Sequence, residues 1–275
     1  MKALTVIMCV AMLATAAITG AARADWEPTM PAKWVQMPDL EFGMDVNATW
    51  KQGPTGGPQW PFVKTIADDF LCTQTGPITD VHIWGSWLND QINRNATFKL
   101  SIHDDVPKGP TSGYSHPGDL LWQKFFSPAE YLVRPWTTAA EDFFEPNQNK
   151  LIGGDTQVWQ YNFLIPTTEA FIQQGSTTNP KVYWLDVMAI LPVPAAGETD
   201  PTVFGWKTSA NHWNDDSVYG DTTDPLYPPT QWLELSDPRT GLSLDQAFVI
   251  TPEPATMVLL GLGVAGLVAR RRSKK

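Results

Sequence analysis

Cysteine, histidine and basic residues are scarce in this 275-residue chain, and each shortage excludes a class of protein. The sequence has only 2 cysteines and 4 histidines, too few for a disulfide-stapled scaffold or a Cys-rich zinc module. Its 19 Lys and Arg residues are outnumbered by 29 Asp and Glu residues, which gives a formal net charge of −10. Phosphate backbones are bound by clustered basic side chains, so we expect no nucleic-acid partner.

Charged residues of both signs together make up only 17% of the chain, whereas 43% of it is hydrophobic. This balance can bury a core and differs from the composition of a disordered protein. A sustained helical period is missing from residues 25–250, where one short turn is expected around 168–174. The same segment carries a net charge of about −16, which favours cations over anionic polymers as ligands.

Alternating hydrophobicity predicts β-strands in this segment. The clearest case runs from Thr97 to His103, where Phe98, Leu100 and Ile102 alternate with polar residues. Further strands are predicted at 63–71, 78–88, 120–126, 157–165, 181–190, 203–208, 231–235 and 244–250. No strand–helix–strand rhythm connects them, so we expect an all-β fold, an antiparallel β-sandwich with jelly-roll-like connections, over 63–250. Residues 25–62, rich in Pro, Trp and Gly, are expected to form an extended N-terminal arm.

The first 24 residues have the pattern of a secretory signal peptide. Lys2 precedes an uncharged run from Ala3 to Thr19, and Ala22-Arg23-Ala24 fits a small-x-small cleavage site. We therefore expect export and a mature chain that begins at Asp25; a permanent membrane anchor is the alternative. Cys72 is then the only mature cysteine, and its apolar neighbours predict a buried packing role.

The C-terminal residues contain three features in order. Pro252-Glu253-Pro254 is followed by an uncharged apolar segment at 255–269 and then by a basic cluster that begins at Arg270. As a helix, 255–269 would span about 22 Å, short of the roughly 30 Å hydrocarbon core, so it predicts a short transmembrane helix with its basic end in the cytoplasm. Gly261 to Gly266 matches G-x-G-x-x-G, but only nine residues follow it, so we expect no nucleotide site.

This tripartite pattern, from Thr251 to Lys275, resembles the PEP-CTERM sorting signal of exported proteins in Gram-negative bacteria. The resemblance implies that an exosortase, a membrane enzyme thought to cleave near the Pro-Glu-Pro motif, is a partner together with the secretion machinery. It implies transient anchoring in the inner membrane, then transfer to the cell surface or to the extracellular polysaccharide matrix of a biofilm. The residues assigned to sorting are Pro252, Glu253, Pro254, Arg270, Arg271 and Arg272.

The middle of the chain also resembles a known family. Strings such as Gly43-Met44-Asp45-Val46, Ala67-Asp68-Asp69-Phe70-Leu71-Cys72 and Phe204-Gly205-Trp206-Lys207-Thr208 are similar to an uncharacterised domain family of exported bacterial proteins. The similarity covers nearly the whole segment between the two ends. It implies no reaction, ligand or catalytic residue.

Tryptophan and clustered acidic residues suggest two binding sites. The chain has 13 Trp residues, and an aromatic ring face can stack on a sugar; Trp206, Trp213 and Trp232 are the candidates for a glycan platform, with core packing as the alternative. Hard cations bind carboxylate and amide oxygens from loops, so a structural calcium ion is a second hypothesis. Its candidate ligands are Asn214, Asp215, Asp216, Asp221 and Asp224.

Catalytic patterns are weak. A glycosidase needs two carboxylates across a cleft, but adjacent residues of a strand, such as Asp68 and Asp69, point to opposite faces. The histidines lack metal-site or nucleophile spacing, and hydrogen bonding within the sandwich is expected for them. The sequence therefore predicts a non-catalytic protein, a structural or glycan-binding component of the cell surface or polysaccharide matrix. A polysaccharide-active enzyme, a glycoside hydrolase or lyase on a jelly-roll scaffold, is the alternative.

Overall fold

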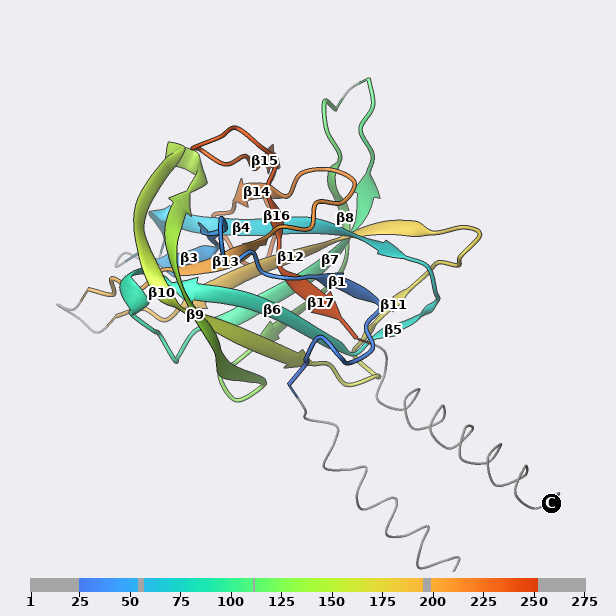
Figure 1. The fold of residues 1–275 in the computed structure, drawn as a ribbon, viewed down its shortest axis with the longest axis horizontal. Helices are drawn as coiled ribbons and strands as arrows, with labels where there is room; N and C mark the ends of the chain where they lie inside the picture. The colour runs from blue at the N-terminus through green and yellow to red at the C-terminus, as the bar shows by residue number, and fades with distance from the viewer. Residues whose placement is uncertain (1–24, 54–56, 111, 195–198, 252–275) are drawn as a thin grey trace, which may run out of the picture. The chain divides into compact units, whose positions relative to one another are not determined.

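The computed structural model describes residues 25–53, 57–110, 112–194 and 199–251, whose strands form two large sheets (Figure 1). Ala32–Thr251 is one compact unit, called the body below. Residues 25–31 are grouped apart from it and contain a turn in which the Met30 amide donates to the Glu27 carbonyl.

The described residues contain seventeen strands and two short 3₁₀ turns. They are β1 (Trp34–Gln36), β2 (Met44–Asn47), β3 (Thr49–Gln52), β4 (Pro58–Cys72), β5 (Gly76–Ile78), β6 (Asp80–Trp87), η1 (Leu88–Asp90), β7 (Thr97–Val106), β8 (His116–Phe126), β9 (Tyr131–Glu145), η2 (Pro146–Gln148), β10 (Lys150–Leu164), β11 (Phe171–Gln173), β12 (Lys181–Leu191), β13 (Phe204–Ser209), β14 (Val218–Asp221), β15 (Leu233–Glu234), β16 (Asp245–Gln246) and β17 (Phe248–Ile250).

The strands assemble into one sheet of eight and one of seven. The eight-stranded sheet has the order β1-β17-β6-β10-β9-β2-β13-β16, and the seven-stranded sheet has the order β15-β14-β4-β3-β12-β7-β8. A separate pair is formed by β5 and β11. The prediction of an all-β fold is confirmed.

The main hydrophobic core receives side chains from both large sheets. Phe98, Leu100 and Ile102 of β7 enter it, as their alternation predicts. Trp206 of β13 and Phe248 of β17 enter it from the eight-stranded sheet. Burial of these large apolar side chains is the main source of stability for such a fold.

Several details differ from the expectations. Two strand pairs are parallel, β3 with β12 and β2 with β9, so the sheets are not purely antiparallel. The segment 25–62 supplies β1, β2, β3 and the start of β4, and is part of both sheets instead of an arm. The turn expected at 168–174 contains strand β11. The jelly-roll connectivity stays a prediction.

Five strands of the eight-stranded sheet close into a ring. β6 pairs with β10, β10 with β9, β9 with β2, β2 with β13, and β13 returns to β6. Figure 1 shows β9 and β10 as a long curved pair at one end of the molecule. Register shifts between β9 and β10 mark irregularities of the kind that bend a strand pair. Each of these strands therefore has one side that faces the inside of the ring. This interior is separate from the main core.

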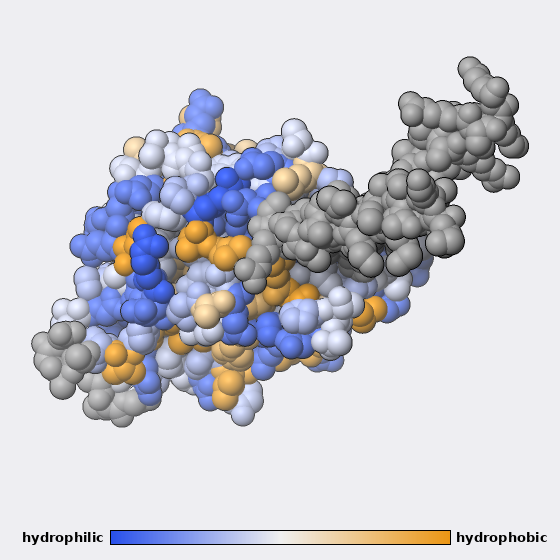
Figure 2. Space-filling view, turned by 90° about the horizontal axis from the view of Figure 1, so that it is seen from below, coloured by the Kyte–Doolittle hydropathy of each residue, from blue (hydrophilic) through white to orange (hydrophobic). Residues whose placement is uncertain are grey.

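Exposed hydrophobic side chains are scattered. On the face shown in Figure 2, hydrophobic residues form several separate areas among hydrophilic ones. This pattern gives no reason to assign an apolar docking surface to that face.

Among the described residues, no helix is long and apolar enough to cross a membrane. The predicted signal peptide at 1–24 and the predicted membrane helix at 255–269 lie outside the described residues.

Candidate functional site

The interior of the strand ring holds charged side chains. Met44 and Val46 of β2 face the main core, so Asp45 between them faces the ring. Lys207 of β13 follows Trp206, a core residue, and faces the ring for the same reason. The strand alternation that directs apolar side chains into the main core thus places Asp45 and Lys207 on the opposite face, inside the ring.

Four charged side chains from four strands meet there. The Lys207 ammonium Nζ lies 2.9 Å from Oδ2 of Asp45 and also contacts Oε2 of Glu141. Glu141 of β9 and Asp155 of β10 are direct partners in the antiparallel ladder. One carboxylate oxygen each from Asp45, Glu141 and Asp155 lies within 4.8 Å of the other two. We call these three residues the ring carboxylates.

The ring carboxylates are almost completely buried. Asp45 is 0%, Asp155 6% and Glu141 9% exposed, and Lys207 is 0% exposed. Burial, followed by the nearby Asp45 carboxylate, raises the pKa of Asp155 to about 9, against the opposing effect of the Ser86 hydroxyl. Three carboxylates with one ammonium leave two negative charges when all are ionised, and a buried site disfavours that state.

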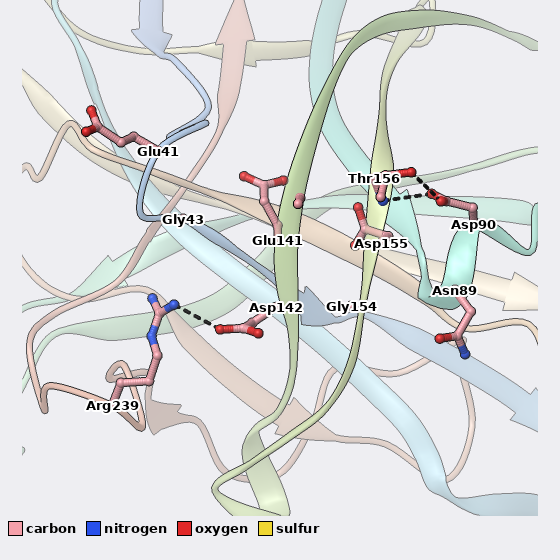
Figure 3. Close-up of a pocket in the computed structure, with 11 residues that line it drawn as sticks. Glu41, Gly43, Asn89, Asp90, Glu141, Asp142, Gly154, Asp155, Thr156 and Arg239 are labelled. Carbon is pink, nitrogen blue, oxygen red and sulfur yellow. Dashed lines mark hydrogen bonds and ion pairs between the residues drawn. The ribbon is translucent and has the colours of Figure 1, made fainter.

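A surface depression opens beside the ring carboxylates. It has a volume of about 420 Å³, and both Glu141 and Asp155 line it (Figure 3). Its rim is polar: Arg239 donates to Asp142 over 3.1 Å, and Asp90 accepts from the Thr156 hydroxyl and amide. The carboxylate oxygens of Glu141 and Asp155 are themselves buried beneath the floor of this depression.

The donor set of this site consists of oxygens. Carboxylate oxygens suit hard cations such as Ca²⁺, Mg²⁺ and Mn²⁺. Among the described residues, the ring carboxylates are the one group of three or more His, Cys, Asp or Glu residues with the spacing of a metal site. They come from β2 and from the consecutive strands β9 and β10, and the sequence did not identify them as ligands.

A second group of acids lies near β16. Asp68 is fully buried, and burial, followed by the charge of Asp245, raises its pKa well above the usual range. Burial raises the pKa of Asp69 to about 8 and that of Asp245 to about 6. Asp69 accepts from the side chain of Asn214, and Asp245 accepts from the Trp213 amide over 2.8 Å. These acids are held in hydrogen bonds and do not line the depression beside the ring carboxylates.

Two histidines lie in the buried hydrogen-bonded positions expected for them. His82 Nδ1 is 2.6 Å from Oδ1 of Asn162, and His103 Nε2 is 2.8 Å from Oδ2 of Asp186. Both imidazoles are at most 1% exposed. Asp186 keeps a lowered pKa despite its burial, because Lys99 and His103 stabilise its charge.

The three predicted platform tryptophans do not form one surface. Trp206 is 0% exposed, and its indole N–H donates to the Ala247 carbonyl, so it is a core residue and cannot stack on a sugar. Trp213 is half-buried with its ring edge-on to Trp34, at 5.0 Å between centroids. Trp232 packs in a different cluster, against Trp184 and Val218.

The predicted calcium ligands also point to separate partners. Asn214 donates to Asp69, Asp215 accepts from the Ser115 amide, and Asp216 accepts from Ser243. Asp221 forms a 2.8 Å ion pair with Lys64, and Asp224 accepts from the Leu226 amide. The four aspartates do not converge within the described residues, so the structure gives no support to a calcium site at 214–224.

A second depression is lined in part by Trp232, one of the three predicted tryptophans. It has a volume of about 420 Å³ and lies between residues 112–118 and 228–232. Tyr114, His116 and Trp232 supply aromatic groups, and Ser112, Thr230 and Gln231 supply polar ones. The Tyr114 hydroxyl donates to the Trp232 carbonyl over 2.6 Å and joins the two segments. We call this the aromatic depression.

Sequence comparison matches the two parts of the chain separately. Residues 251–272 match the PEP-CTERM protein-sorting motif, which marks an exported protein that is sorted by an exosortase. The sorting residues Pro252, Glu253, Pro254, Arg270, Arg271 and Arg272 lie outside the described residues. No curated protein matches the chain. Residues 32–251 match a family described as a domain of unknown function, DUF7901, and this span covers most of the chain. The protein therefore belongs to the DUF7901 family and carries a PEP-CTERM sorting motif after its family domain.

Proposed function

We propose that this exported protein is a non-catalytic, glycan-binding component of the cell surface or extracellular polysaccharide matrix. In this proposal the sorting motif directs the protein to its destination outside the cell, and the body contains the binding site. The single observation that supports it is the aromatic depression, in which aromatic rings and small polar side chains line one hollow.

The chemistry of the aromatic depression suits a sugar. An apolar ring face can cover the C–H face of a pyranose, while hydroxyl and amide groups hydrogen-bond to its hydroxyls. Tyr114 and His116 are only partly buried, with ring centroids 6.2 Å apart and planes inclined by 69°. Trp232 is 7% exposed, so we assign it a supporting role and assign the contact surface to Tyr114 and His116.

A glycan array on the purified protein tests this proposal. We expect reproducible binding to one class of glycan, and at least about tenfold weaker binding by Tyr114→Ala, because truncation of an aromatic anchor removes its contact surface. Tyr227→Ala is the matched control, since Tyr227 is 64% exposed and lies outside the aromatic depression. Two results would favour other roles. Silence from a folded protein would favour a structural component, and cleavage of the arrayed glycans would favour an enzyme.

A further inference from the structure

We propose that the ring carboxylates, Asp45, Glu141 and Asp155, bind one divalent cation of the calcium type and thereby close the strand ring. This site is independent of the aromatic depression, with which it shares no lining residue. It also differs from the loop at 214–224 that the sequence suggested.

Charge is the first argument. The ring carboxylates and Lys207 carry two negative charges in excess when all are ionised, and all four side chains are at least nine-tenths buried. One divalent cation neutralises this excess, whereas a monovalent cation leaves one charge in a poorly solvated place. Uncompensated buried charge is expensive, so the cluster needs either two protons or one such ion.

The state of the oxygens is the second argument. Asp155 is 6% exposed, and its carboxyl group contacts the Asp45 carboxyl group and the Ser86 hydroxyl. Asp45 pairs with Lys207 through Oδ2, whereas Asp155 forms no ion pair with a basic group of the described residues. Two buried carboxylates in contact stay ionised together only when a cation lies beside them, so this pair supports a cation as the ligand.

Size favours calcium. Two oxygens bound to one Ca²⁺ at 2.3–2.6 Å can lie roughly 5 Å apart, whereas two on Mg²⁺ reach only about 4 Å. The ring carboxylates offer oxygens within 4.8 Å of one another, a range that the larger ion covers fully. Calcium also takes six to eight ligands, so its binding requires side chains to move and admit waters from the depression beside Glu141 and Asp155.

Calorimetric titration of the purified, EDTA-treated protein with CaCl₂, and in parallel with MgCl₂, tests the site. We expect one calcium ion per chain, weaker binding of magnesium, and a Tm that rises by roughly 5–10 °C at a calcium concentration about 100-fold above Kd. Asp155→Asn should weaken calcium binding at least about tenfold and abolish the rise in Tm, since it removes a ligand charge. Because Asn is uncharged and has nearly the same shape as the carboxyl group, the Tm of Asp155→Asn in EDTA should equal or exceed that of the wild type.

Two controls separate this site from its neighbours. Asp142→Asn alters the same depression at a residue paired with Arg239, and Asp224→Asn alters the loop that the sequence suggested; both should bind calcium normally. Glu141→Gln is the second ligand variant, and near-UV circular dichroism of the 13 tryptophans checks that each variant is folded. Absence of calcium binding at millimolar concentration, or normal binding by folded Asp155→Asn and Glu141→Gln, would overturn the proposal.

Discussion

The backbone N–H of Gln246 donates a hydrogen bond to Oδ2 of Asp68 over 2.6 Å, and this bond joins the two large sheets. Asp68 lies on β4 between Ile66 and Phe70, which both enter the main core, so its carboxyl group also points inward. Gln246 lies on β16 at the edge of the eight-stranded sheet. An acid in the interior thus serves as an acceptor for backbone that would otherwise lack one.

Asp68→Ala should destabilise the body most strongly at low pH. At pH 5 the substitution deprives the buried Gln246 amide of its acceptor, and we expect the free energy of unfolding to fall by about 1–3 kcal/mol. At pH 9 the loss should be smaller, because the variant also avoids the ionisation of a fully buried acid whose pKa is raised. Urea denaturation at both pH values measures the difference. An equal or larger loss at pH 9 would contradict this account.

Stability of the protein in EDTA should decrease as the pH rises from about 5 to 9. Burial raises the pKa of Asp245 to about 6, of Asp69 to about 8 and of Asp155 to about 9, so the folded state retains protons that the unfolded state releases near pH 4. The stabilisation is complete below the unfolded pKa and is lost as the pH passes the folded values. We expect a decrease of at least about 2 kcal/mol in the free energy of unfolding.

Asp186 should decrease the stability of the protein at acidic pH, where it becomes protonated. Its folded pKa is lowered, so its contribution is present above the unfolded value and is lost when the pH falls through the folded value. The stability maximum in EDTA should therefore lie near pH 4–5. Asp155→Asn should flatten the decrease between pH 7 and 9, and saturating calcium should do the same in the wild type. Stability that rises steadily from pH 5 to 9 in EDTA would contradict the prediction.

Lys207→Met should be strongly destabilising. The substitution leaves Asp45 and Glu141 without their buried cation, and breaking a buried pair in this way costs about 3–5 kcal/mol of unfolding free energy. Lys124→Met is the control, because Lys124 pairs with the exposed Glu169 and should contribute at most about 1 kcal/mol. If calcium occupies the ring carboxylates, it should restore part of the lost stability of Lys207→Met and none of that of Lys124→Met.

Gly205→Ala tests how tightly the strand ring is packed. A Cβ atom at Gly205 would lie 2.6 Å from Cβ of Asp45 and 2.7 Å from Cζ of Phe143, which is too close for either contact. We expect a loss of about 1–3 kcal/mol in unfolding free energy from overpacking. Gly113→Ala is the matched control, since nothing lies within 4 Å of its added Cβ, and it should change stability by less than about 0.5 kcal/mol. Equal effects of the two substitutions would show that the ring interior can relax.

The sequence predicted strands well where one face is apolar. Both β7 and β12 were predicted: β7 alternates because one side enters the main core, and β12 is apolar on both sides apart from Lys181 and Asp186 because its other side packs in smaller clusters. β9 was missed, since most of its residues from Leu132 to Asp142 are polar or partly exposed. β2 was read as part of an arm, because its short alternating string contains acidic and amide side chains at buried positions.

The candidate cation site could not be located from the sequence. Glu141 lies 96 positions after Asp45, and Asp155 lies 14 positions after Glu141. Only the closure of the ring brings Lys207 to these three acids. One local signal exists: Asp45 and Lys207 each stand beside large apolar residues in a strand, which predicts a charged group on the face opposite the core. That signal cannot tell which charges meet.

The last strand of the body determines how the sorting segment is attached mechanically. β17 lies between β1 and β6 and ends at Ile250, directly before the matched sorting motif. At the junction, Thr251 donates from its amide to the Asp80 carbonyl over 3.2 Å and from its hydroxyl to the Asp80 carboxylate over 3.0 Å. A force applied to the tail by a membrane or a processing enzyme therefore acts on a strand that is hydrogen-bonded to β1 on one side and to β6 on the other. Both sets of backbone hydrogen bonds must break before the body unfolds from this end.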